Sequence, residues 1–346
     1  MSSIYIRTGL IALLIETFIS PIFKKHGWWR VWIFWTLISA GVWVLCFYGM
    51  PPDEPGQHND LAGLRLIIVI DFIVYMAFLV CLMVYGLSNW KTRRREKKER
   101  KAEKIDWYTK CANQGDAVAQ CRLGNCYYYG RGVKQDYSKA VEWYTLAANK
   151  GVANAQYQLG VCYSFGEGVA KDHVKAALWY SKAANQGEVG AQYNLGVCYF
   201  AGFGVTKDLT LAAEWYAKAA KQGLAKAQYF LGYCYENGNG VEKNFTKAFE
   251  LYTLSANQNY DKGLFALGNC YNFGNGVEKD YSKAVEFYTK AANQGYAVAQ
   301  FHLGLCYYKG HGVAEDLSKA KKWLREAAEQ GYQNAIDLLN AMYENI

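Results

Sequence analysis

Cysteine is the residue type in this chain with the widest chemistry, because thiols form disulfides, bind metals and act as nucleophiles. Six of the ten cysteines recur at a spacing of 36 residues: Cys126, Cys162, Cys198, Cys234, Cys270 and Cys306. Residues spaced in this way occupy equivalent places in successive structural units, and equivalent helices lie about 8–10 Å apart. A disulfide needs α-carbons within about 7 Å, so these cysteines cannot pair with one another. We therefore expect small buried thiols in a reducing compartment.

Two other residue patterns are candidates for chemistry. Pairs of the form Gly-x-Gly, such as Gly166 and Gly168, recur six times. A dinucleotide-binding loop needs a preceding strand, whereas these pairs follow predicted helices, so they are interpreted as turns. The histidines show no metal-ligand spacing and no paired carboxylates: His26, His58, His173, His302 and His311. The sequence thus predicts no catalytic residue, no metal ligand, no cofactor and no enzymatic activity.

A periodic motif shows which elements carry these residues. The motif is Leu-Gly-x-Cys followed by Tyr, and its leucines are Leu123, Leu159, Leu195, Leu231, Leu267 and Leu303. In one unit, the pattern predicts a first helix over Ala153 to Phe165, a turn, and a second helix over Val174 to Asn185. Asp172 is expected to cap the second helix. Such units stack on their neighbours and bury a continuous core, so the default function is binding.

The repeated unit resembles a known family. It reads Ala-x-x-x-Leu-Gly-x-x-Tyr-x-x-Gly-x-Gly-Val, then Asp, Lys-Ala-x-x-Trp-Tyr and Ala-Ala-x-x-Gly, and six copies cover Asp116 to Gly331. This is similar to the Sel-one-like repeat, a relative of the tetratricopeptide repeat. The resemblance implies an all-α, right-handed superhelical solenoid of antiparallel helix pairs, and adaptor roles in membrane-associated assemblies. A cysteine-rich branch of the family, linked to β-lactam binding or hydrolysis, supplies the alternative of a ligand-binding or hydrolytic protein.

The fifth unit departs from this pattern. Asn259 replaces its terminal glycine, Gly263 and Leu264 replace Ala-Gln, and Leu251 replaces tryptophan. We expect local differences in how this unit stacks on its neighbours.

Ahead of the repeats, the composition changes to that of a membrane segment. Trp28 to Met50 and Leu64 to Leu87 each reach the roughly 20 apolar residues that span a bilayer. The expected organisation is 1–27, an apolar interfacial or re-entrant segment; 28–50, a transmembrane helix; 51–63, a short non-cytoplasmic loop; 64–87, a transmembrane helix; 88–104, a basic helical stalk; 105–331, the solenoid; and 332–346, a C-terminal capping helix.

Most of the net positive charge lies in residues 1–104. Residues 1–104 hold 14 Lys/Arg and 8 Asp/Glu, whereas residues 105–346 hold 24 and 22. The nearly neutral repeats give no support for nucleic-acid binding. Lys91 to Lys104 carries nine Lys/Arg, which is interpreted as a topology signal or as a site for anionic lipid headgroups. We expect an integral protein of a bacterial cytoplasmic membrane with its repeats in the cytosol.

Asp71 is an acidic residue inside the second predicted span. A carboxylate there is expected to be paired or protonated. Pairing with Arg65 is favoured, and self-association of the hairpin through this acid, giving a membrane oligomer, stays open.

The predicted partner site is the set of first-helix positions that vary between units. Positions −5, −1, +2 and +6, counted from the leucine of the Leu-Gly-x-Cys motif, lie on one helical stripe. The stripe is rich in aromatic and amide side chains, which are typical of partner recognition: Arg122, Asn125, Tyr129, Gln158, Phe165, Asn194, Phe230, Tyr233, Asn269, Phe273 and His302. We expect these residues to bind a protein or peptide partner.

Overall fold

The computed structural model describes residues 90, 92–93, 95–97, 99–100 and 102–344. Its regular elements are helices that alternate along the chain. The first helices of the pairs, called A helices below, are α4 (Ala117–Tyr129), α6 (Ala153–Phe165), α8 (Val189–Ala201), α10 (Ala225–Asn237), α12 (Asp261–Phe273) and α14 (Ala297–Lys309). The second, or B helices, are α5 (Tyr137–Asn149), α7 (His173–Asn185), α9 (Leu209–Lys221), α11 (Phe245–Asn257), α13 (Tyr281–Asn293) and α15 (Leu317–Glu329), and α16 (Gln333–Glu344) follows.

These helices confirm the predicted all-α array of repeated pairs. The first helix of the second unit has the predicted bounds, Ala153–Phe165, while its partner begins one residue earlier than expected, at His173. The predicted caps are also confirmed, since the Asp172 carboxylate accepts a hydrogen bond from the Lys175 amide at 3.0 Å. A single helix, α16, follows the last pair, as expected of the capping segment.

The chain divides into two compact units, Met1–Arg95 and Glu96–Ile346. The predicted segments 1–27, 28–50, 51–63 and 64–87 lie outside the described residues, as does Asp71. None of the helices in the described part of the chain has the length and apolar content needed to cross a bilayer. The described residues between 90 and 104 are helical, and nearly all of them are exposed.

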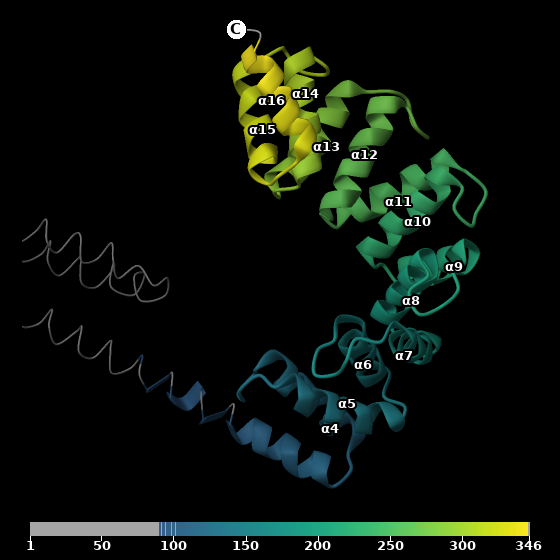
Figure 1. Ribbon diagram of the computed structural model, residues 1–346, viewed down its shortest axis with the longest axis vertical. Coiled ribbons are helices and arrows are strands. Elements are labelled where there is room, and N and C mark those ends of the chain that lie inside the picture. Colours follow the sequence, from purple (N-terminus) through teal and green to yellow (C-terminus); the bar gives the residue numbers. More distant parts are fainter. Residues whose placement is uncertain (1–89, 91, 94, 98, 101, 345–346) are drawn as a thin grey trace, which may run out of the picture. The chain divides into compact units, whose positions relative to one another are not determined.

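Within Glu96–Ile346, each helix packs against its neighbours in sequence. The pairs follow one another along an arc, with α6 and α8 toward the inside and α7 and α9 toward the outside (Figure 1). The A helices α10 and α12 also contact each other directly, as expected on the inner side of a curved stack. The A helices α6 and α8 therefore lie on the inner side of the arc.

Within each of the first five repeats, the two helices meet where a tyrosine of the B helix lies on the glycine of the Leu-Gly step. A Cβ atom added to Gly160 would lie 2.6 Å from the Tyr180 ring, and one added to Gly268 would lie 2.7 Å from the Tyr288 ring. No side chain fits in that space. The glycine is therefore required for close contact between the helices, and the tyrosine rings are almost completely buried.

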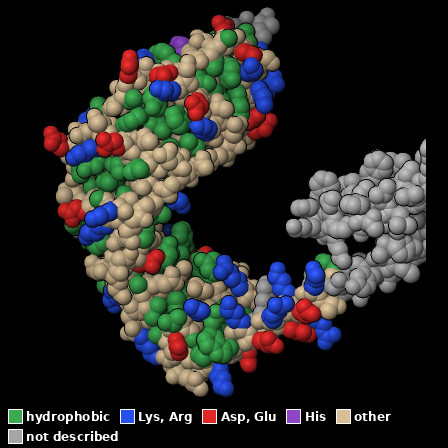
Figure 2. Space-filling model, turned by 180° about the vertical axis from the view of Figure 1, so that it is seen from behind, with side chains coloured by type: hydrophobic (Ala, Val, Ile, Leu, Met, Phe, Trp, Pro, Cys, Tyr) green, Lys and Arg blue, Asp and Glu red, His purple; other side chains and the backbone are tan. Residues whose placement is uncertain are grey.

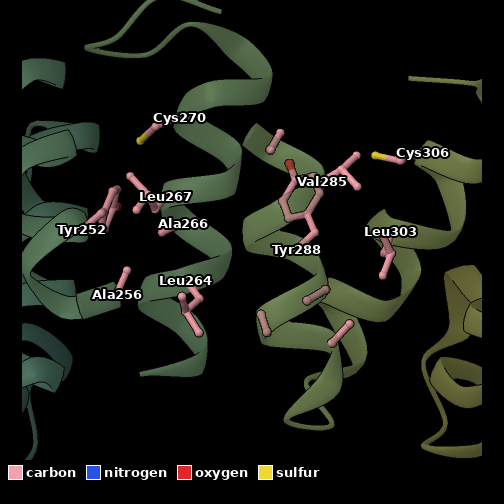
Figure 3. Close-up of a cluster of buried hydrophobic side chains, with 14 of the residues drawn as sticks. Tyr252, Ala256, Leu264, Ala266, Leu267, Cys270, Val285, Tyr288, Leu303 and Cys306 are labelled. Atoms are coloured by element: carbon pink, nitrogen blue, oxygen red, sulfur yellow. The ribbon is translucent and has the colours of Figure 1, made fainter. Parts of the chain in front are cut away.

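The tyrosines also join successive repeats. Leu267 and Cys270 of α12 lie on one side of Tyr288 of α13, and Leu303 and Cys306 of α14 lie on the other (Figure 3). Each B helix is thus covered by two A helices, which makes the core continuous from one repeat to the next.

The Gly-x-Gly turns have a packing function. The second glycine of a turn lies against the backbone at the start of the preceding repeat's B helix. A Cβ atom on Gly204 would overlap the carbonyl oxygen of His173, and one on Gly240 would overlap that of Leu209. These turns follow helices, as the sequence predicted, and their glycines are needed for contact between repeats.

A buried glutamine reinforces most of the joints. The Gln156 amide donates to the carbonyl oxygen of Ala148 at 3.1 Å, and its own oxygen accepts from Gln186 at 2.7 Å. Equivalent pairs join Gln222 to Gln192, Gln258 to Gln228, and Gln330 to Gln300. Each pair satisfies a polar group that would otherwise be buried without a partner.

Two joints lack this pair. Lys150 occupies the donor position in the first unit and bonds to the Gly115 carbonyl oxygen, which leaves the Gln120 side-chain oxygen buried without a partner among the described residues. In the fifth unit Leu264 replaces the buried glutamine, and the joint there is apolar.

Two other departures of the fifth unit are accommodated locally. Gly263 leaves space for Ser255, since a Cβ atom there would overlap the serine hydroxyl oxygen. Asn259 adopts the left-handed backbone conformation, with φ 56°, that glycine adopts at this place in the other units. Asparagine tolerates this region better than most residues.

We predict that Gly160→Ala destabilises the array. Alanine favours a helix by about 1 kcal/mol over glycine, but overpacking against the Tyr180 ring costs about 1–3 kcal/mol. The free energy of unfolding in urea should therefore fall. The control is Gly190→Ala in α8, whose Cβ would meet only the far end of the Tyr157 ring. Equal or greater stability of Gly160→Ala would contradict the assigned contact.

Candidate functional site

The A helices carry fewer charged residues than the B helices. The A helices α6 and α8 contain no Asp, Glu, Lys or Arg, whereas every B helix contains at least one lysine. Figure 2 shows one face of the array, where apolar patches alternate with acidic and basic side chains. A partner that lies along α6 and α8 therefore meets no charged side chain of those helices, whereas α4, α10, α12 and α14 carry one or two charged residues each. The chemistry available to it there is apolar contact and hydrogen bonding.

The predicted stripe divides into two groups in the structure. Five of its residues are exposed: Arg122, Tyr129, Phe165, Tyr233 and Phe273. The other six are half-buried: Asn125, Gln158, Asn194, Phe230, Asn269 and His302. The stripe as a binding surface stays a prediction, and the first group exposes more of its side chains to a partner than the second.

Several half-buried members of the stripe have partners within the repeats. Asn125 accepts a hydrogen bond from the Tyr144 hydroxyl at 2.8 Å, and Asn269 accepts one from Tyr288 at 2.7 Å. Phe230 stacks on Tyr216 with ring centroids 5.5 Å apart. Asn125 and Asn269 thus join the two helices of one repeat, and Phe230 joins α10 to α9 of the preceding repeat.

His302 is also part of this internal structure. Its ring lies 5.1 Å from that of Phe265 and 5.7 Å from that of Tyr288, measured between centroids. Burial lowers the pKa of His302 below its usual value of 6.5, because the charged form loses hydration there. His302 is therefore neutral at pH 7 and acts as a packed aromatic ring.

The exposed group contains large apolar rings. Phe165 is 70% exposed and Phe273 is 61% exposed, each at the last position of its A helix. Tyr129, at the end of α4, is 47% exposed, and the Arg131 guanidinium lies 4.6 Å from its ring centroid. Rings this exposed are typical of surfaces that contact a partner.

The sequence prediction missed several exposed aromatic residues, among them Phe203 and Trp107. Phe203 stands between the glycines of its turn, is 48% exposed, and stacks on His173 with ring centroids 5.2 Å apart. Trp107, which precedes the first repeat, is 57% exposed. A signal for Phe203 was available in the sequence, because the middle position of the turns varies between repeats. That position holds Arg131, Glu167, Phe203, Asn239, Asn275 and His311.

The cysteines show no reactive environment. The eight in the described residues are free, and five of the six that recur every 36 residues are buried. Burial raises the pKa of Cys198 and Cys234 to about 11, and that of Cys162 and Cys270 to about 12. Nucleophilic attack and metal binding need a thiolate, so these thiols are unsuited to both. Among the described residues, no cluster of His, Cys, Asp and Glu is arranged to hold a metal ion.

Comparison with known proteins identifies the repeat. Residues 117–152, 153–188, 189–224, 225–260, 261–296 and 297–332 each match the family described as the Sel1 repeat. No significant match was found among curated proteins.

Solved structures show the same fold. A protective antigen of uropathogenic Escherichia coli with this repeat fold is 40% identical; the match covers 69% of this chain and 51% of that one, with a TM-score of 0.63. This chain thus spans about half the length of that protein. A Sel1 repeat protein of Oxalobacter formigenes is 30% identical, with 67% and 93% covered and a TM-score of 0.62. The Helicobacter pylori cysteine rich protein B, 28% identical over 38% and 95%, has a TM-score of 0.32, too low to support an argument.

The buried thiols predict a pH dependence. The pKa of Cys198 is about 11 in the folded chain and 9.0 ordinarily, so the folded state keeps a proton that the unfolded chain loses. Stability contributed by this thiol is therefore complete below pH 9 and is lost as pH rises through about 11, at up to about 1.4 kcal/mol per pH unit. Urea unfolding between pH 8 and 11 should show a smaller decline for Cys198→Ala than for the wild type. Equal slopes would mean that the thiol ionises freely and would reopen a reactive role.

Proposed function

We propose that this chain, which belongs to the Sel1 repeat family, is a non-catalytic scaffold for a protein or peptide partner. Members of this family generally mediate protein–protein interactions. The observation that carries this proposal is the set of exposed aromatic rings on the A helices, which carry few charges. Phe165 and Phe273 leave most of their surface in water, although neither is needed to fill the core. Burying such rings against a partner supplies binding energy at little entropic cost.

The binding surface in this proposal is the exposed group of the stripe, with the half-buried group as its support. The partner lies along the A helices and buries the rings that end α4, α6 and α12. Because α6 and α8 are uncharged, the partner segment is itself largely uncharged where it crosses them, since an unpaired charge buried there would be costly.

We further propose that a membrane anchor precedes the scaffold. Trp28 to Met50 carries one charged residue and Leu64 to Leu87 carries two, and Lys91 to Lys104 supplies the positive flank typical of a cytoplasmic side. The same basic segment would contact anionic headgroups. The scaffold would then hold cytosolic partners at a bacterial cytoplasmic membrane.

Paired substitutions test the binding surface. The double variant Phe165→Ser and Phe273→Ser in the full-length chain should lower partner capture at least about tenfold, since exposed aromatic anchors dominate binding energy. The matched control is Leu178→Ser with Leu254→Ser, two B-helix leucines that are 53% and 50% exposed. Captured proteins are compared by mass spectrometry, and thermal unfolding checks the fold. Phe230 is left unchanged because it packs on Tyr216. Loss of capture by the B-helix control alone would contradict the proposal.

Reporter fusions test the anchor. A reporter that is active only in the cytosol, fused after Ile346, should be active, because the positive flanks stay inside. A reporter of the exterior, inserted near Gln57, should respond as well. Digestion of the repeats by protease added to spheroplasts would overturn this topology.

A further inference from the structure

Among the B-helix tyrosines that lie on the glycines, one buried hydroxyl lacks the hydrogen-bond acceptor that equivalent hydroxyls have. Tyr144 donates to Asn125 and Tyr288 donates to Asn269, both on the A helix of the same repeat. Tyr252 donates instead to Glu236 at 2.7 Å. The hydroxyl of Tyr216 is buried with no hydrogen-bond partner among the described residues.

The sequence of α8 explains this difference. The position that holds Asn125 in the first unit and Asn269 in the fifth holds Val197 in the third. The position that holds Glu236 in the fourth unit holds Phe200 in the third. Both possible acceptors are therefore replaced by apolar side chains. Buried polar groups are nearly always hydrogen-bonded in folded proteins, so an acceptor from outside the chain is the natural complement of this hydroxyl.

Aromatic side chains of the two neighbouring A helices, α8 and α10, lie beside the Tyr216 ring. The rings of Phe230 and Phe200 have centroids 5.5 and 6.5 Å from that of Tyr216, and both residues are half-buried. Tyr233, which is 37% exposed, lies beside Phe200. Phe230 and Tyr233 belong to the stripe already proposed to bind the partner.

The chemistry of the site selects the acceptor. The side chains described around Tyr216 are Tyr193, Val197, Cys198, Phe200, Phe230 and Cys234, and none of them carries a positive charge. A carboxylate would lose its hydration there with no cation to offset the loss, whereas an amide oxygen accepts the bond without a buried charge. An amide is also what the first and fifth units use.

We propose that an asparagine or glutamine side chain of the bound peptide inserts between Phe200 and Phe230 and accepts the hydrogen bond of the Tyr216 hydroxyl. The amide takes the place of Asn125 in the first unit and Asn269 in the fifth. Bulky apolar neighbours of the amide cover the displaced rings. This inference rests on the proposed function, because it names the chemistry of the partner at the same surface.

Three capped tripeptides test the site: acetyl-Leu-Gln-Leu-amide, and the same peptide with methionine or glutamate at its centre. They are titrated into the full-length chain, and dissociation constants are taken from the NMR signals of labelled phenylalanine rings. Methionine has nearly the shape of glutamine but no carbonyl group. The glutamine peptide should bind about fivefold more tightly than the methionine peptide, the effect of one hydrogen bond. The glutamate peptide should bind most weakly.

Two variants assign this preference to Tyr216. Val197→Asn supplies the acceptor from α8, so the glutamine preference should disappear. Val161→Asn, the same change one repeat earlier, is the matched control and should keep it. Tyr216→Phe should also abolish the preference, and it should not lower the unfolding temperature, because no hydrogen bond is lost. Tyr288→Phe should lower that temperature, because Asn269 loses its donor.

Equal binding of the glutamine and methionine peptides, or a preference that survives both Val197→Asn and Tyr216→Phe, would overturn the amide site. Absence of binding by all three peptides would overturn it as well. Neither result would decide the proposed function, which the capture experiment with Phe165→Ser and Phe273→Ser tests separately.

Discussion

The array depends on the contact between a B-helix tyrosine and an A-helix glycine. Only glycine leaves room for the ring, and the ring in turn fills the space between one A helix and the next. The contact therefore fixes the distance between helices within a repeat and contributes to the core between repeats. The last pair keeps the arrangement with Leu324 on Gly304, where a smaller apolar side chain replaces the ring.

Buried polar groups add specificity to this apolar core. The paired glutamines fix the joints between repeats, and asparagine or glutamate on the A helix satisfies most of the tyrosine hydroxyls whose partners the structure records. Both exceptions have a cause in the sequence: Lys150 leaves the Gln120 side-chain oxygen without a donor, and Val197 leaves the Tyr216 hydroxyl without an acceptor. Such unsatisfied groups lower stability, so they are of interest where they coincide with the proposed binding surface, as Tyr216 does.

Much of the repeat fold could be predicted from the sequence. The 36-residue period, the aspartate caps and the glycine turns determine the helix bounds almost to the residue, because each of these signals acts locally. The candidate surface was harder to predict. Variation between repeats identified the A-helix stripe, but it could not separate Phe165, which is exposed, from Phe230, which stacks on Tyr216. Whether a variable asparagine faces a partner or accepts an internal bond depends on the neighbouring helix, which sequence spacing alone does not reveal.

The most direct test of this account is a double-mutant cycle between Gly160→Ala and Tyr180→Leu, read from the free energy of unfolding in urea. Leucine is the residue that faces Gly304 in the last pair, where a Cβ atom would lie 2.9 Å from Leu324, against 2.6 Å from the Tyr180 ring at Gly160, so leucine leaves slightly more room. If the ring occupies the space that alanine needs, the loss caused by Gly160→Ala should be smaller by about 1 kcal/mol or more when Tyr180 is already leucine. Additive effects of the two substitutions would contradict the account, because they would mean that the ring and the glycine do not determine each other.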